Sequence, residues 1–212
     1  AKGIRLTTGQ QKIGEALWVE IVRPTGGIGW VNADCLTEEA SPDDFCADER
    51  VRRLLMDFES AVRLRDGEAL AQLVSPTHGL MIRHEWWNPQ VSFQPREVAI
   101  LFEDTRSYDW GIADGSGLPI QGSFQEVILP RLLDVLESNY TMYCNTLETG
   151  VATGGTAGLV ILPYEYVNFR YYAFYRAGSV DMEMDWRTWA IGIEYVNVKP
   201  TIVFLVQYHW EI

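Results

Sequence analysis

The last part of the chain contains two long segments whose side chains alternate as in β-strands. They are Thr188–Val196 and Thr201–Trp210, and Asn197-Val198-Lys199-Pro200 lies between them. Two such segments joined by turn-forming residues predict a β-hairpin. The second segment runs almost to the last residue, so we expect the C-terminal region to be held in a sheet. This hairpin restricts the fold more than any other feature of the sequence.

A further strand signal precedes the hairpin, where aromatic residues alternate along residues 164–175. Alternation places Tyr164, Tyr166 and Tyr172 on one face together with Asn168 and Arg170. We therefore expect a strand in which several aromatic side chains share one surface.

Helix signals dominate the part of the chain before these strands. Ser41 can accept hydrogen bonds from free backbone amides at a helix start, and Pro42 suits the first helical position. Asp66 and the Ser123-Phe124-Gln125-Glu126 capping box begin two further helices, the second of which contains Pro130. After Ser41, apolar residues follow at helical spacing: Val51, Leu54, Leu55, Phe58, Ala61 and Val62. Helices followed by antiparallel strands predict an α+β fold.

The first segment of the chain consists of short strand patterns broken by glycine and proline. Trp18–Val22 alternates, Pro24-Thr25-Gly26-Gly27 predicts a turn, and Gly29-Trp30-Val31-Asn32-Ala33 begins another strand before Leu36. This pattern resembles the C-terminal half of a bacterial SH3 (SH3b) domain, without that family's usual N-terminal strand. The resemblance implies a partial SH3-like β segment over residues 1–38 that contacts cell-wall material or another protein.

The order of elements after this segment resembles the cone-shaped NTF2-like (cystatin-like) fold. Residues Phe58–Leu73, with Arg65-Asp66-Gly67 near their centre, resemble the first two helices of the SnoaL-like proteins in that group. The resemblance implies a curved antiparallel sheet wrapped on helices over residues 47–212, with residues 39–46 as a linker. In such folds the enclosed cavity serves small-molecule binding, isomerase or dehydratase chemistry, or protein contact, so the fold does not decide the function.

The chain is strongly acidic, with 29 Asp and Glu residues against 17 Lys and Arg residues and a formal charge of −12. A nucleic-acid surface needs concentrated cationic side chains to replace counterions, so this balance argues against a nucleic-acid partner. The longest aliphatic and aromatic run, Ile202–Val206, is far too short to cross a bilayer. The SH3b resemblance, and not the composition, implies an extracytoplasmic protein that is secreted or associated with the cell envelope.

Three cysteines occur, at positions 35, 46 and 144. Cys35 and Cys46 are close enough in sequence to form a disulfide in an oxidising compartment, which would leave Cys144 free. The alternative is three buried thiols that act as small hydrophobic side chains.

A cavity inside the cone would take a small hydrophobic ligand against aromatic walls. The residues that we expect to line it are Trp110, Tyr164, Tyr166, Tyr172 and His209. His84, which is followed by Glu85 and Trp86, is expected near the mouth of the same cavity. The sequence predicts no cofactor.

An enzyme of the isomerase or dehydratase type would instead need a carboxylate base beside the cavity. The candidates are Glu194, Glu165 and Asp185. Glu194 alternates onto the same face as Ala190 and Gly192, whose small side chains would leave room for a substrate. The ordinary alternative is that this face meets solvent.

No metal site is predicted. Asp181, Glu183 and Asp185 would share one face of an extended segment, but no calcium-loop spacing surrounds them. An exposed strand or loop rim explains these carboxylates better.

These observations favour an extracytoplasmic accessory protein without catalysis. Its SH3b-like segment would contact the cell wall or a protein, and its NTF2-like domain would bind a small ligand or a partner, which includes a second copy in a homodimer. The alternative is an enzyme that acts on a small hydrophobic molecule by acid–base chemistry.

Overall fold

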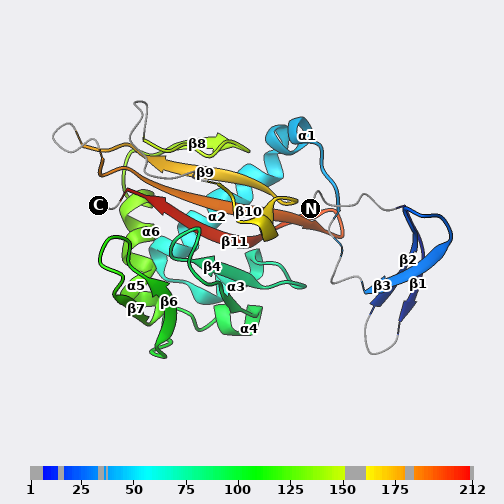
Figure 1. Cartoon of the computed structure of the whole chain (residues 1–212), viewed down its shortest axis with the longest axis horizontal. Helices are drawn as coiled ribbons and strands as arrows, with labels where there is room; N and C mark the ends of the chain where they lie inside the picture. Colours follow the sequence, from blue (N-terminus) through cyan, green and yellow to red (C-terminus); the bar gives the residue numbers. More distant parts are fainter. Residues whose placement is uncertain are drawn as a thin grey trace.

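The computed structural model describes residues 7–13, 17–32, 36, 38–150, 161–179 and 184–210. The chain has a mixed α+β fold, as the sequence predicts (Figure 1). The strands are β1 Thr8–Ile13, β2 Leu17–Val22, β3 Ile28–Asn32, β4 Leu80–Arg83, β5 Val91–Phe93, β6 Tyr108–Ile112, β7 Pro119–Gly122, β8 Thr141–Cys144, β9 Arg170–Arg176, β10 Arg187–Val196 and β11 Lys199–His209. The helices are α1 Pro42–Ala47, α2 Glu49–Leu64, α3 Gly67–Leu73, α4 Pro95–Val98, α5 Phe124–Val127 and α6 Leu129–Leu136.

A six-stranded sheet in the order β5-β4-β11-β10-β9-β8 forms the centre of the larger part of the molecule. Strand β11 pairs parallel with β4, and the other neighbours are antiparallel. The predicted hairpin is confirmed as β10 and β11. Asn197 and Val198 form its turn with φ angles of 51° and 65°, the left-handed values that a tight two-residue hairpin turn requires.

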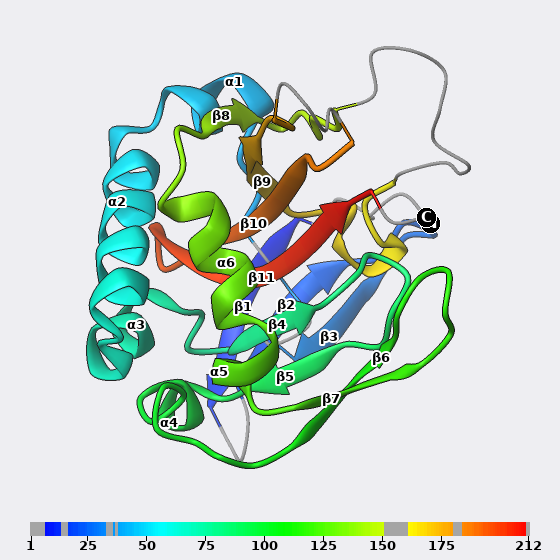
Figure 2. The same cartoon turned by 90° about the vertical axis from the view of Figure 1, so that its left-hand side faces the viewer.

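Both faces of this sheet are covered. Helices α2 and α6 pack on one face, and Figure 2 shows them running along the same side of the sheet. Leu205, Ile191 and Trp189 point toward these helices, whereas Ala190 and Val206 point toward a second cluster on the opposite face. Because successive side chains of β10 point to opposite faces of the sheet, this one strand contributes to an apolar cluster on each face.

The predicted helix that begins at Ser41 is divided into α1 and α2. Asp48 adopts an extended conformation with φ −73° and ψ 107°, and its side chain caps the start of α2 by accepting a hydrogen bond from the Arg50 amide. Helix α1 occupies most of the segment that we predicted as a linker over residues 39–46. Phe45 in α1 is fully buried in the main core, so this segment belongs to the larger domain.

The predicted pairing of Cys35 with Cys46 is wrong. Cys46 at the end of α1 forms a disulfide with Cys144 at the end of β8, 98 residues away in sequence. Packing of α1 against the β8–β9 side of the core brings these two cysteines together, and Tyr172 of β9 donates a hydrogen bond to the Cys46 carbonyl at 3.2 Å. Cys35 lies outside the described residues.

The strand predicted over residues 164–175 is shorter than expected, because β9 begins only at Arg170. Residues Tyr164–Tyr166 form a single 3₁₀ turn instead. The Tyr166 amide donates to the Pro163 carbonyl at 2.9 Å, and the Phe169 amide donates to the Tyr166 carbonyl at 3.0 Å. Local hydrogen bonds thus replace cross-strand pairing, and Tyr164 and Tyr166 do not share a strand face with Tyr172.

Strands β1, β2 and β3 form a separate antiparallel sheet in that order. Figure 1 shows this sheet set to one side of the larger part. Val19 is its one buried hydrophobic residue among those described, while Trp18, Val22 and Ile28 are exposed. Within the described ranges, no helix is long and apolar enough to cross a membrane.

Candidate functional site

The space between the six-stranded sheet and the helices is filled by side chains in the part of the chain that the structure describes. Trp110 is fully buried there, and its Nε1 donates to the Gly122 carbonyl at 3.0 Å. Tyr172 is buried in the same core and packs on Phe45, with ring centroids 5.5 Å apart. Two of the predicted ligand-binding residues therefore serve as core side chains with satisfied polar atoms.

The predicted tyrosines at 164 and 166 lie elsewhere. Tyr166 is buried on the opposite face of the sheet, where its ring stacks on Phe204 at 4.2 Å and its hydroxyl donates to Gln90 Oε1 at 2.6 Å. Burial raises the pKa of Tyr166 above its ordinary value. Tyr164 is 63% exposed. The predicted aromatic residues thus do not converge on one cavity.

Two of the three predicted carboxylates lie at the surface in ion pairs. Glu165 accepts a hydrogen bond from Arg83 Nη2 at 2.7 Å. Asp185 is bound by Arg176, with its Oδ1 3.1 Å from Nη2, and this hydrogen bond lowers the pKa of the Asp185 carboxyl. Neither carboxylate faces an enclosed apolar space, which a general base with a raised pKa would need.

Glu194 is buried, and the expectation that its face meets solvent is wrong. Its side chain is 1% exposed, and its Oε1 lies 2.7 Å from Nδ1 of His78. The other carboxylate oxygen, Oε2, has no hydrogen-bond partner. The buried Glu194 and the partly exposed His78 therefore form a carboxylate–imidazole pair, the kind of pair that can hold or move a proton.

The small residues beside Glu194 do not leave the room that the sequence suggested. Phe204 lies directly across from Gly192 in the sheet, and a Cβ atom at position 192 would lie 2.0 Å from the Phe204 ring. Gly192 is therefore needed because the ring occupies the place of a side chain. Tyr166 stacks on the same ring, so aromatic side chains fill the space beside Gly192.

A second buried polar group lies at the other end of the central strands. His209 at the end of β11 contacts Glu85 Oε1 through Nδ1, and both side chains are nearly buried. The His84 ring stands edge-on to His209 with centroids 6.2 Å apart. Arg131 of α6 donates from Nε to His84 Nε2 at 2.7 Å. We refer to these four residues as the histidine cluster.

His84 is neutral in this environment. Burial, followed by the positive charge of Arg131, lowers its pKa to about 3. Because Nε2 accepts the hydrogen bond from Arg131, the imidazole proton resides on Nδ1. Gln207 lies two residues before His209 on β11 and is fully buried, with no hydrogen-bond partner for either amide atom.

Sequence reasoning singled out His84, Glu85 and His209 of this cluster but missed Arg131, and it also missed the buried Gln207. Arg131 follows Pro130 within an apolar helix, and Gln207 interrupts an apolar strand. Both residues are polar side chains at positions where the apolar pattern predicts burial, and this could have identified them from the sequence. The pattern does not predict which residues they contact.

The described residues contain no group of three or more His, Cys, Asp or Glu side chains arranged to hold a metal ion. Of the three alternating carboxylates in the sequence, Asp181 and Glu183 lie outside the described residues.

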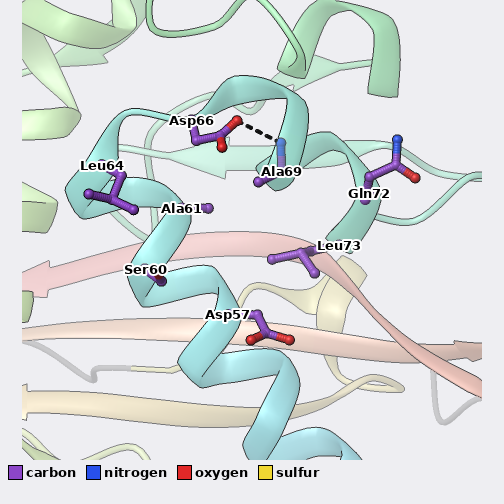
Figure 3. A pocket seen from close by; sticks show the side chains of 8 residues that line it. All are labelled: Asp57, Ser60, Ala61, Leu64, Asp66, Ala69, Gln72 and Leu73. Carbon is purple, nitrogen blue, oxygen red and sulfur yellow. Dashed lines mark hydrogen bonds between the residues drawn. The ribbon is translucent and has the colours of Figure 1, made fainter.

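Among the residues that the structure describes, two surface hollows are large enough for a side chain of a partner or a ligand. One, of about 450 Å³, is lined by Glu38, Asp44, Asp48, Arg50 and Tyr195 among others. The other, of about 330 Å³, lies between α2 and α3 (Figure 3). We call the second hollow the α2–α3 groove.

The α2–α3 groove combines an apolar floor with an acidic rim. Ala61, Ala69 and Leu73 form the floor, and Leu64 is 75% exposed at one end. Figure 3 shows the carboxylates of Asp57 and Asp66 at opposite ends, and Asp66 caps α3 by accepting from the Ala69 amide at 2.9 Å. Its lining contains no lysine or arginine, so it favours an apolar, cationic partner.

Comparison of the chain with protein-family models, with curated proteins and with solved structures gave no match.

Proposed function

We propose that this chain is an extracytoplasmic bacterial accessory protein that acts by surface contact and not by catalysis. Its three-stranded sheet would be the SH3b-like part that contacts cell-wall material or another protein, and its larger part would be an NTF2-like domain that binds a partner. The observation that carries the proposal is the filled space between sheet and helices. With Trp110 and Tyr172 packed there, recognition falls to the outer surface.

Three further observations support the proposal. The Cys46–Cys144 disulfide fits an oxidising compartment, because reducing pools keep cytosolic thiols free. The helices packed on one face of an antiparallel sheet, with a parallel contact only between β11 and β4, agree with the element order that suggested an NTF2-like domain. Exposed Trp18 on the small sheet supplies a contact residue.

Cosedimentation with purified cell-wall sacculi tests the contact. We expect the protein to pellet with sacculi and Trp18→Ser to reduce the pelleted fraction by about tenfold, the effect of losing one contact of about 1.4 kcal/mol. Met142→Ser is the matched control, since Met142 is 46% exposed and Trp18 is 43% exposed. Equal pelleting of all three proteins would contradict a specific role for the small sheet.

The pair of buried Glu194 with partly exposed His78 favours one alternative, acid–base catalysis on a small hydrophobic molecule. Glu194 would be the base, and His78 would hold the proton at Nδ1. Because the Glu194 side chain is only 1% exposed, neighbouring side chains would have to move to admit a substrate. Turnover of a keto-steroid or a similar enolisable substrate by the protein, lost in Glu194→Gln but retained in Glu165→Gln, would establish this alternative in place of the binding function.

A further inference from the structure

The connection between α6 and β8 contains the tripeptide Asn139-Tyr140-Thr141. An asparagine that is followed by any residue except proline, and then by serine or threonine, is the acceptor sequence for an N-linked glycan. Asn139 is the one asparagine of the whole sequence that stands in such a tripeptide. Because a tripeptide of this kind also arises by chance, the placement of its side chains decides whether it can serve as an acceptor.

Exposed and half-buried residues alternate along this connection. Asn139 and Thr141 are exposed, and so is Glu137, two residues before the asparagine. Ser138 and Tyr140, which lie between them, are half-buried. The acceptor amide and the hydroxyl that a glycan transferase recognises are thus both open to solvent, beside a carboxylate that a cationic side chain of the transferase can bind.

Specific contacts hold the two intervening side chains against the larger part. Ser138 Oγ donates to a backbone carbonyl of α6 at 2.7 Å. The Tyr140 ring stacks on Phe174 with centroids 4.7 Å apart, and its hydroxyl donates to Glu59 Oε2 at 2.7 Å. Since these side chains point inward, the residues on either side of each one face solvent.

The backbone around Asn139 is accessible as well. Residues 138–140 lie between the end of α6 and the start of β8, and Thr141 forms the first pair of β8 with Tyr175. Strand β8 is the last strand of the six-stranded sheet, and Figure 1 shows it at the edge. The ends of such strands open at little cost in free energy, so this segment can enter the active site of a transferase while the core stays folded.

The disulfide fits the compartment in which such glycans are added. Cys144, on the same strand as Thr141, is paired with Cys46. Disulfides persist outside the reducing cytosol, and the acceptor sequence carries meaning in secreted proteins. The pairing of the cysteines and the exposure of Asn139 are independent observations, and both agree with modification of this loop.

We infer that Asn139 is a site of N-linked glycosylation. The co-reactant is an oligosaccharide joined to a polyprenyl diphosphate. Nδ2 of Asn139 forms a bond to the anomeric carbon of the first sugar, and the bond from that carbon to the phosphate oxygen breaks. The diphosphate leaves with the electron pair, the amide gives up one proton to a base, and nothing is oxidised or reduced.

This inference goes beyond the proposed contact function and rests on its extracytoplasmic location. A glycan at Asn139 would stand beside the outer edge of β8. Because a glycan is bulky and strongly hydrated, it would also oppose pairing of this edge with a strand of another molecule.

Glycan transfer to the purified, folded chain tests the site. The full chain is incubated with a bacterial oligosaccharyltransferase and a polyprenyl diphosphate oligosaccharide, and the intact mass is measured. We expect the mass to rise by one oligosaccharide. Enzymatic release of the glycan should convert Asn139 to aspartate, and mass spectrometry of the peptides then locates the modified position.

Variants at Thr141 provide the matched comparison. Thr141→Val removes the hydroxyl but keeps the branched shape, and it should abolish transfer, whereas Thr141→Ser should still be modified. Asn139→Gln should remain unmodified. Glu137→Gln should slow transfer about tenfold, because one charge-assisted hydrogen bond to the transferase is lost. All four positions of change are exposed, and far-ultraviolet circular dichroism verifies that the variants fold.

Three results would overturn the inference. A synthetic peptide of residues 134–144 that gains an oligosaccharide, beside a folded chain that does not, would show that the fold withholds the acceptor. Failure of both would show that the sequence is not an acceptor. Modification that persists in Asn139→Gln would lie at another residue. An unmodified chain that still pellets with sacculi would reject this inference and leave the proposed function in place.

Discussion

The two sheets of this molecule differ in how much of their surface is buried. In the six-stranded sheet, β10 and β11 contribute apolar side chains to a core on each face, and residues such as Trp189 and Val206 are inaccessible to solvent. In the three-stranded sheet, Val19 is the single buried hydrophobic residue among those described. Similar antiparallel pairing thus occurs with and without a surrounding core.

This difference assigns the stability of the fold to the larger part and recognition to the small sheet. Burial of apolar area is the main favourable contribution to folding, so the larger sheet with its helices should determine the global unfolding transition. The small sheet keeps large apolar side chains at its surface, which suits a contact surface. Substitutions in the small sheet should therefore leave the global unfolding transition unchanged, and substitutions in the larger part that do not unfold it should leave binding by the small sheet unchanged.

The largest expected effect comes from the core of the larger part. Phe58 of α2 is fully buried, and Phe58→Ala should lower the free energy of unfolding by about 3–5 kcal/mol through lost burial and a residual cavity. Urea denaturation followed by circular dichroism measures this change. Val19→Ala in the small sheet should leave the main transition within about 0.5 kcal/mol. A comparable loss from Val19→Ala would show that the two sheets unfold as one unit.

Removal of the disulfide should have the next largest effect. Cys46 and Cys144 close a loop of 98 residues, and the double variant Cys46→Ser/Cys144→Ser should lose about 2–5 kcal/mol because its unfolded chain is less restricted. Thermal unfolding with and without a reducing agent measures the change. The reductant should destabilise the unchanged protein and have no effect on the double variant, and equal sensitivity of both would point to a different pairing.

Acid should destabilise the larger part through the histidine cluster. The pKa of His84 is about 3 in the folded protein, below its ordinary value of 6.5. The unfolded chain therefore binds a proton first as the pH falls, and stability is lost from about pH 6.5 down toward pH 3. Between pH 7 and pH 5 this linkage amounts to about 2 kcal/mol. Urea titrations at both values measure it.

A variant isolates the contribution of this one group. His84→Gln keeps a polar side chain beside Arg131 but does not titrate, so its free energy of unfolding should vary less between pH 7 and pH 5 than that of the unchanged protein. An identical pH dependence in both proteins would assign the effect to other groups. Binding of the small sheet to sacculi should be the same in both proteins at pH 7.

Local features of the fold could be read from the sequence. The β10–β11 hairpin follows from alternation on both sides of a short turn, and α3 follows from the capping side chain of Asp66. The break near Pro130 is likewise local, since α5 ends at Val127 and α6 carries the proline in its first turn. Neighbouring residues suffice to specify each of these elements.

The site depended on contacts that are distant in sequence. Pairing of Cys46 with Cys144 requires α1 to pack near β8, and the contact between Glu194 and His78 joins residues 116 positions apart. The contact between Arg131 and His84 likewise joins a helix to the end of a strand 47 residues earlier. Alternation predicted which face a side chain occupies, but not what covers that face.

The smallest expected effect comes from a substitution at the surface of the larger part. It tests whether the stability of this part depends on how deeply a residue is buried or only on its lying in this part. Glu165 pairs with Arg83 at 2.7 Å, yet its side chain is 56% exposed, and exposed ion pairs contribute about 0–1 kcal/mol. Glu165→Gln should therefore change the free energy of unfolding by less than about 1 kcal/mol, measured by urea denaturation beside Phe58→Ala. A loss as large as that of Phe58→Ala would mean that stability in the larger part does not follow the buried apolar area, and the contrast between the two sheets would then need another cause.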